Sequence, residues 1–233
     1  MIAAHYNHPS IYIWGILNEC ASDTAYGREC YKTQLELIKS LDVTRPRSFS
    51  SCRFKTDICF DLVDVVSYNI YPKWYHNTPV AMYLDDLYKW VQTTGGAGKP
   101  FLITEVGAGA IYGYRTPAKV KWSEEYQVLA LEEQLGAILS YKDCSGVYIW
   151  QFCDVRVTND WWNTRPRTMN NKGIVDEYRR PKLSYETVKR ILDLWIHIGN
   201  KQIENRLKIY RNRTIERKHD GKAEEVFTEK LSV

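Results

Sequence analysis

Short apolar segments alternate with longer amphipathic segments along most of this 233-residue sequence, and this alternation is the strongest constraint on its fold. Five segments have the composition of strands, and they cover residues 11–17, 47–51, 62–71, 101–105 and 146–152. Most are continuous apolar runs rich in β-branched and aromatic residues, which is typical of strands buried on both faces. Their alternation with helices predicts a parallel sheet covered by helices.

The stretches between the strands have helical patterns, over residues 28–41, 79–94, 122–141 and 181–194. A complete (β/α)₈ barrel needs eight strands, eight helices and about 250 residues. Five strands and four helices therefore predict an α/β fold, an incomplete TIM barrel that corresponds approximately to strands four to eight. We assign residues 1–197 to this domain and residues 198–233 to a charged C-terminal extension. Residues 1–6 have the pattern of a helix already under way, so we expect the chain to begin within a larger protein.

Composition and charge exclude several classes of protein. The net charge of +4 comes from 32 basic and 28 acidic residues that are well mixed, so no nucleic-acid partner is expected. No segment approaches the roughly 20 apolar residues of a membrane span. The six cysteines lack the spacing of a zinc site, and several lie in apolar runs. Buried, reduced thiols in a cytoplasmic protein are the expectation, with no metal site.

Two carboxylates directly follow strongly apolar strands. Glu19 ends the segment IYIWGILNE, and Glu105 ends FLITE. The C-terminal ends of parallel strands meet at one end of a barrel, where reactive residues lie. Either residue alone is better explained as a rim residue with a structural partner. As a pair at equivalent strand ends, they favour catalysis by two carboxyl groups about 5 Å apart, as in a retaining glycosidase.

The residues around the two carboxylates resemble those of glycoside hydrolase family 2. Residues 7–19 (NHPSIYIWGILNE) are similar to its acid/base signature, and residues 103–108 (ITEVGA) resemble its nucleophile strand. The resemblance extends to about Leu192. It implies that Glu105 is the nucleophile and that Glu19 is the general acid and then the general base.

The resemblance also implies contacts to the sugar. Asn18 is similar to the residue that hydrogen-bonds the 2-hydroxyl, although capping the strand end is an equal alternative. Tyr71 resembles the tyrosine that orients the nucleophile, and Trp150 resembles the aromatic wall of the sugar subsite. Tyr75 corresponds to a segment near the aglycone. For an isolated Tyr or Trp, packing in the core is the simpler explanation, and the 8 Trp and 17 Tyr also fit an aromatic-rich core.

The loop after the last strand resembles the part of β-glucuronidases that binds the C6 carboxylate of the substrate. Asn170 and Lys172 form an Asn-x-Lys pair there, and a cation with an amide donor suits a carboxylate. Arg165 or Arg167 is expected to add a second cation, and we assign Arg167. A turn with a solvated Lys172 is the structural alternative.

These features predict a retaining β-glycoside hydrolase, with a β-glucuronide as substrate. β-Galactosidase and β-galacturonidase are alternatives within the family, because the uronic acids share their carboxylate and differ at the C4 hydroxyl. A catalytically inactive fragment or a carbohydrate-binding remnant is an alternative outside the class of enzymes. No cofactor is expected, since two carboxyl groups suffice for the chemistry. The expected partner is a small-molecule or oligosaccharide β-glycoside, with a homo-oligomer as an open expectation for the full-length form.

Overall fold

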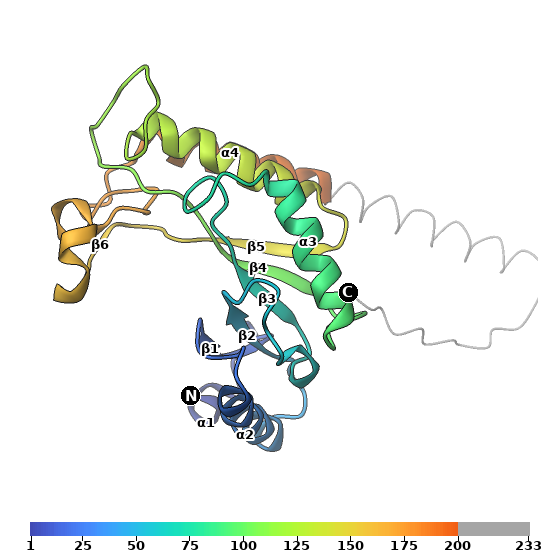
Figure 1. The fold of residues 1–233 in the computed structure, drawn as a ribbon. Helices are drawn as coiled ribbons and strands as arrows, with labels where there is room; N and C mark the ends of the chain where they lie inside the picture. The colour runs from blue at the N-terminus through green and yellow to red at the C-terminus, as the bar shows by residue number, and fades with distance from the viewer. Residues whose placement is uncertain (200–233) are drawn as a thin grey trace, which may run out of the picture. The chain divides into compact units, whose positions relative to one another are not determined.

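A computed structural model describes residues 1–199 of the chain. The chain divides into two compact units, Met1–Ile191 and Leu192–Val233. The first unit contains the sheet and is described below (Figure 1). The predicted charged extension lies almost entirely outside the described residues, and the predicted boundary at residue 197 stays a prediction.

The first unit is built on one five-stranded parallel sheet, as the sequence predicts. Its strands follow one another in chain order, β1-β2-β3-β4-β5. Their bounds are Trp14–Asn18 for β1, Arg47–Ser51 for β2, Val66–Asn69 for β3, Phe101–Val106 for β4 and Cys144–Ile149 for β5. Each strand is parallel to its neighbour. Parallel strands joined in order by helices are the arrangement of a partial (β/α) TIM barrel.

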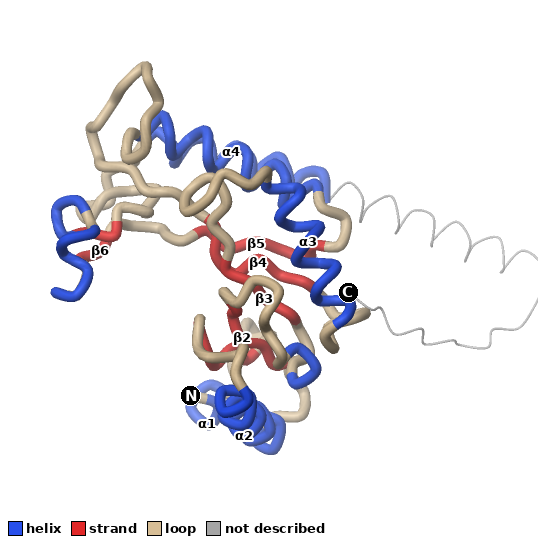
Figure 2. Tube along the Cα trace, viewed as in Figure 1, coloured by secondary structure: helices blue, strands red, loops and turns tan. Residues whose placement is uncertain are grey.

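α-Helices follow β1, β3 and β4, and a short helix precedes β1 (Figure 2). Helix α1 spans Ile2–His5, α2 Ala25–Leu41, α3 Val80–Thr93 and α4 Glu124–Ser140. A further helix begins at Leu183 and continues to the last described residue. Helix α2 packs against β1 and β2, whereas α4 packs against β4 and β5. Figure 1 shows α3 and α4 beside β4 and β5, at a distance from α2.

Local signals in the sequence explain where the long helices begin. The hydroxyl of Thr24 accepts a hydrogen bond from the Gly27 N–H at the start of α2, and Ser123 caps Tyr126 in α4 in the same way. Such caps satisfy backbone donors that lack a partner inside the helix. The buried face of α2 carries the apolar stripe of the sequence pattern. Its buried residues are Gly27, Tyr31, Leu35 and Ile38.

Most predicted segments differ from the structure by up to three residues at an end, and two differ in kind. The predicted strand 62–71 is shorter, because Phe60–Leu62 forms a 3-10 helix and only Val66–Asn69 is paired as β3. The loop that was predicted after the last strand contains an antiparallel pair, β6 (Val155–Arg156) and β7 (Met169–Asn170). The 3-10 helices Asn159–Thr164 and Pro166–Thr168 connect them. Two-residue strands leave almost no periodic signal in a sequence.

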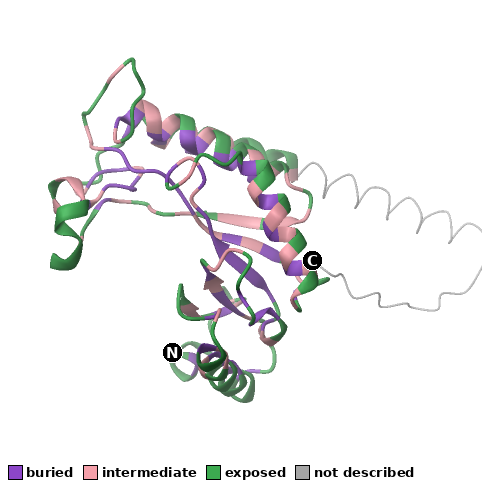
Figure 3. Cartoon of the chain, viewed as in Figure 1, coloured by how far each residue is buried: buried purple, intermediate pink, exposed green. Residues whose placement is uncertain are grey.

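Burial is deepest in the middle of the sheet (Figure 3). All four residues of β3 are buried, whereas the edge strands β1 and β5 are only partly buried. The expectation of buried cysteines was wrong for most of them. All six are free thiols, but only Cys59 is buried, and Cys20 and Cys52 are exposed. The latter two lie beyond the last residues of β1 and β2, where the chain leaves the core.

No helix within residues 1–199 is both long enough and apolar enough to span a lipid bilayer.

Candidate active site

A cavity of about 810 Å³ lies at the C-terminal ends of the strands. Eight of the nine residues predicted for the site line it. They are Asn18, Glu19, Tyr71, Tyr75, Glu105, Trp150, Asn170 and Lys172. They come from segments that are up to 154 residues apart and meet because parallel strands end at the same edge of a sheet.

Glu19 follows the last residue of β1 and is held by the neighbouring strands. Its N–H donates to the carbonyl of Ser50 at 2.9 Å, and its Oε1 accepts a hydrogen bond from the Asn69 amide at 2.9 Å. The backbone of Glu19 is left-handed, with φ 54°. This conformation costs a residue with a side chain about 1 kcal/mol, and such strain is concentrated at functional sites. The backbone of Glu19 is therefore held in place, and its exposed side chain faces the cavity.

Glu105 lies in β4, in register with Asn69 of β3. The Tyr71 hydroxyl donates to Glu105 Oε2 at 2.5 Å. Burial raises the pKa of Glu105, the hydrogen bond from Tyr71 lowers it, and the negative charge of Glu19 raises it further, so that the net direction is upward. Burial and the contact with Glu105 also raise the pKa of Tyr71, so its phenol remains a donor. Each carboxylate is therefore within electrostatic reach of the other across one cavity.

Asn69 connects the two strands that carry the carboxylates, and the sequence analysis did not identify it. Its Nδ2 donates to Asn18 Oδ1 at 2.8 Å as well as to Glu19, and its Oδ1 accepts from the Thr104 hydroxyl at 2.8 Å. The residue is 5% exposed. One signal in the sequence could have identified Asn69. It is a polar residue at the end of a buried strand, and this strand lies between the two strands that end near Glu19 and Glu105.

The ammonium of Lys172 lies among aromatic rings on another wall of the cavity. Its Nζ is 4.7 Å from the ring centroid of Tyr71, 4.9 Å from that of Tyr75 and 5.8 Å from that of Trp74. It donates a hydrogen bond to the Tyr75 hydroxyl at 2.9 Å. The residue is 3% exposed, and burial lowers its pKa. Within residues 1–199, no carboxylate lies within ion-pair distance of Lys172, so this cation is available to an anionic ligand.

The second cation at this wall is Arg165, and the prediction of Arg167 is corrected. Arg165 lines the cavity and donates to the Tyr75 hydroxyl at 3.5 Å. Arg167 is absent from the lining, and its guanidinium pairs with Glu177 at 2.5 Å. The turn is irregular here, because two consecutive left-handed residues, Arg167 with φ 57° and Thr168 with φ 56°, interrupt the 3-10 geometry after Arg165.

Asn170, the last residue of β7, and Trp150, which follows β5, also line the cavity. The amide oxygen of Asn170 accepts the N–H of Lys172 at 3.3 Å, which fixes the turn between them. Trp150 directly follows β5, and its N–H donates to the carbonyl of Val106 at 2.9 Å. Its indole is 38% exposed, as an aromatic surface for a ligand requires.

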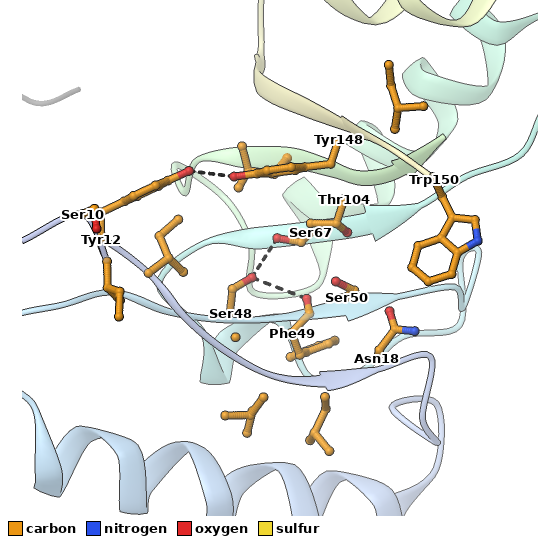
Figure 4. Close-up of a pocket in the computed structure, with 17 residues that line it drawn as sticks. Ser10, Tyr12, Asn18, Ser48, Phe49, Ser50, Ser67, Thr104, Tyr148 and Trp150 are labelled. Carbon is orange, nitrogen blue, oxygen red and sulfur yellow. Dashed lines mark hydrogen bonds between the residues drawn. The ribbon is translucent and has the colours of Figure 1, made fainter. Parts of the chain in front are cut away.

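A second cavity of about 680 Å³ adjoins the first along the inner face of the sheet (Figure 4). Asn18 and Trp150 line both cavities. Figure 4 shows them at one end, with Tyr12 and Tyr148 at the other, where the two hydroxyls are 2.7 Å apart. The second cavity contains neither candidate carboxylate. The chemistry therefore belongs to the first cavity.

The arrangement suits acid/base and nucleophilic chemistry on a ligand with an anionic group. Glu19 and Glu105 face one cavity, and the cations Lys121, Arg165 and Lys172 line it together with several aromatic side chains. Within residues 1–199, no group of three or more His, Cys, Asp or Glu residues could hold a metal ion.

Comparison with known proteins identifies the family. The model of the TIM barrel domain of glycosyl hydrolases family 2 matches residues 1–196. The β-glucuronidase of Rattus norvegicus is 33% identical over 190 residues, which cover 76% of this chain and 28% of the relative. The β-glucuronidase of Mus musculus is 32% identical over 189 residues, with the same coverage. The chain thus spans 28% of the length of these relatives.

Solved structures give the same result. A family 2 β-galacturonidase of Eisenbergiella tayi bound to galacturonate has a TM-score of 0.81 and 76% sequence identity, over 82% of this chain and 35% of that one. The β-D-glucuronidase of Dictyoglomus thermophilum has a TM-score of 0.73 and 26% identity, over 83% of this chain and 33% of that one.

Proposed function

Because the chain belongs to glycosyl hydrolase family 2, we propose that it catalyses the hydrolysis of β-linked uronic acids with retention of anomeric configuration. The observation that carries the proposal is the single cavity that Glu19, Glu105 and the partly desolvated ammonium of Lys172 share. The two carboxylates supply the chemistry, and the ammonium selects an acidic sugar.

In the first step, Glu105 attacks the anomeric carbon while the glycosidic bond breaks. Glu19 gives its proton to the leaving oxygen, so a covalent glycosyl-enzyme and a free alcohol form. In the second step, Glu19 removes a proton from water, which attacks the anomeric carbon and releases Glu105. The hydrogen bond from the Tyr71 hydroxyl holds Glu105 in one orientation during both steps.

Recognition of the sugar carboxylate is assigned to Lys172 and Arg165, with the amide of Asn170 beside them. In the structure, both cations donate a hydrogen bond to the phenol oxygen of Tyr75. A hydrogen bond from each cation to a sugar carboxylate would be stronger, because both partners are then charged. A neutral sugar leaves the buried ammonium without an anionic partner, which costs binding energy. Trp150 and Tyr75 offer apolar ring faces to the sugar.

The relatives give two candidate acidic sugars, galacturonate and glucuronate. The sequence favours glucuronate by its Asn-x-Lys pair, and the curated relatives are β-glucuronidases. The 76% sequence identity to a β-galacturonidase bound to galacturonate supports galacturonate more strongly. The identities to the two β-glucuronidases are 33% and 26%, less than half of that value. We therefore propose a β-galacturonide as the first substrate to test and a β-glucuronide as the second.

The test compares para-nitrophenyl β-galacturonide, β-glucuronide and β-galactoside as substrates of the intact protein. We expect kcat/KM for at least one uronide to exceed that for the galactoside by at least about 100-fold, the scale that an unpaired buried charge imposes. The Lys172→Ala variant should lose activity on the uronides and little on the galactoside. Lys73→Ala is the matched control, because Lys73 pairs with Glu133 and does not line the cavity.

Two results would contradict the proposal. If Lys172→Ala lowered kcat/KM equally for acidic and neutral sugars, Lys172 would not be the residue that binds the sugar carboxylate. Binding of a uronic acid in calorimetry, without turnover of any glycoside, would indicate a carbohydrate-binding protein instead of an enzyme.

A further inference from the structure

A buried ion pair lies beneath the segment that carries Asn170 and Lys172. The side chains of Asp154 and Lys182 are both 0% exposed, and Lys182 Nζ lies 2.8 Å from Asp154 Oδ1. Neither residue lines the candidate active site. Burial of two charges costs several kcal/mol per ion before their attraction is counted, so a buried pair is poor evidence for a purely stabilising role.

The pair contacts the backbone on both sides of Lys172 and also the backbone of Ala110. Besides Asp154, the ammonium of Lys182 donates to the carbonyls of Ala110 at 2.6 Å and Asn171 at 3.1 Å. All three of its protons are therefore used. The same Asp154 oxygen accepts the N–H of Gly173 at 2.9 Å. The ion pair thus holds the backbone on both sides of Lys172.

Other contacts leave this segment no room to shift. The carbonyl of Lys172 accepts from the Gln151 N–H at 3.1 Å, and the carbonyl of Gly173 accepts from Gln127 Nε2 at 3.0 Å. A Cβ at Gly173 would lie 2.3 Å from the Val175 carbonyl oxygen. The backbone that carries Lys172 is therefore packed against its neighbours without space for a side chain at position 173.

We propose that Asp154 and Lys182 are positioning residues that fix the Asn170–Lys172 segment and so determine the preference of the enzyme for acidic sugars. This inference rests on the proposed function. The ammonium of Lys172 can meet a sugar carboxylate only if its backbone is fixed relative to Glu19 and Glu105. The ion pair supplies that connection, because it joins the segment to Ala110, which follows β4, and to the start of the helix at Leu183.

The experiment measures kcat and KM of the intact protein for para-nitrophenyl β-galacturonide, β-glucuronide and β-galactoside. We expect Lys182→Met to lower kcat/KM for the uronide about 10- to 100-fold, mainly through KM, since small displacements of a binding group have effects of this size. The galactoside should change little. In a Lys172→Ala background, Lys182→Met should cause little additional loss on the uronide, because the group that it positions is already absent.

A second variant guards against misfolding. Asp154→Leu combined with Lys182→Met replaces the ion pair by apolar side chains, which buried pairs often tolerate. It should fold and still lose the preference for uronides. The matched control is Asp42→Leu with Arg45→Met, which removes another ion pair, with side chains 0% and 16% exposed. That control should leave the ratio of uronide to galactoside activity unchanged.

The outcomes separate the two claims. A wild-type protein without preference for uronides would overturn the proposed function and this inference together. A wild-type preference with equal losses on acidic and neutral sugars in Lys182→Met would overturn the inference alone. Fully additive losses in the Lys172→Ala and Lys182→Met double variant would also overturn it.

Discussion

At the scale of single residues, the candidate site combines two carboxylates that repel each other with a cation that burial destabilises. The charge of Glu19 contributes to the raised pKa of Glu105, and burial lowers the pKa of Lys172. An ammonium and two carboxylates in one cavity partly offset these costs for each other, since the charge of Glu105 supports the charged form of Lys172 and the reverse also holds. The carboxylate of a uronic acid bound beside Lys172 would stabilise the charged form of its ammonium further.

The coupling between the carboxylates predicts a change in pH dependence. Glu105 must be ionised to attack, so activity falls as the pH drops through its raised pKa. Glu19→Gln removes one cause of that increase, so the acid limb of kcat/KM should move to lower pH. A dinitrophenyl uronide is the appropriate substrate, because its leaving group needs no general acid. The control is Glu132→Gln, because Glu132 lies on α4 and does not line the cavity, and it should not move the limb. An unchanged limb in Glu19→Gln would contradict the coupling.

Asn69 gives a second prediction at this scale. Its amide contacts Asn18, Glu19 and Thr104, so Asn69→Ala should leave the Glu19 carboxylate without a fixed orientation. We expect a loss of about 100-fold in kcat for a substrate with a poor leaving group and a smaller loss for a dinitrophenyl glycoside. Ser67→Ala is the matched control on the same strand, because its hydroxyl contacts Ser48. Equal losses on both substrates would assign Asn69 a structural role only.

At the scale of elements, the position of the site depends on where the strands end. Glu19 follows the last residue of β1, Asn69 ends β3, and Glu105 is the residue before the end of β4. The central strands carry this arrangement, since β3 and its neighbour β4 hold the buried residues Val66, Tyr68, Phe101 and Ile103. Loss of packing there should therefore affect stability and site geometry together.

Ile103 provides the test of this connection. It is 0% exposed in β4, two residues before Glu105, and Ile103→Ala should lower the free energy of unfolding by about 2–5 kcal/mol. Leu129→Ala is the comparison, because Leu129 lies on α4 and is 43% exposed, so its loss should be small. Chemical denaturation of both variants measures the difference. A loss below about 1 kcal/mol in Ile103→Ala would show that β4 is not packed as described.

Two predicted elements match the structure to within one residue at each end. Residues 47–51 coincide with β2, and the predicted helix 79–94 differs from α3 by one residue at each end. The strand at 62–71 was predicted too long, because its apolar run continues through a 3-10 helix before β3 and through Tyr71 beyond it. An apolar run in a sequence indicates that a segment is buried. It does not distinguish a paired strand from a buried turn.

At the scale of the whole molecule, the convergence of the site could be predicted from the parallel topology, but its details could not. The eight predicted residues that line the cavity follow from strand ends and from the family resemblance. Arg165 lines the cavity in place of the predicted Arg167, in a short turn with two consecutive left-handed residues, and such a turn leaves no periodic signal. Asn69 and the pair of Asp154 and Lys182 act through contacts between distant segments, and such contacts are invisible in a linear pattern. Cytoplasmic location, a homo-oligomer and the absence of a nucleic-acid partner stay predictions.

The most direct test of the central claim is covalent trapping of the nucleophile. A deoxyfluoro-uronosyl fluoride forms the glycosyl-enzyme quickly and releases it slowly, because the fluorine destabilises the transition state of both steps while the fluoride leaves readily. We expect mass spectrometry of the digested, inactivated protein to find the uronosyl group on the peptide that contains Glu105, and no label in Glu105→Gln. A label on Glu19 or on any residue outside the cavity would contradict the account.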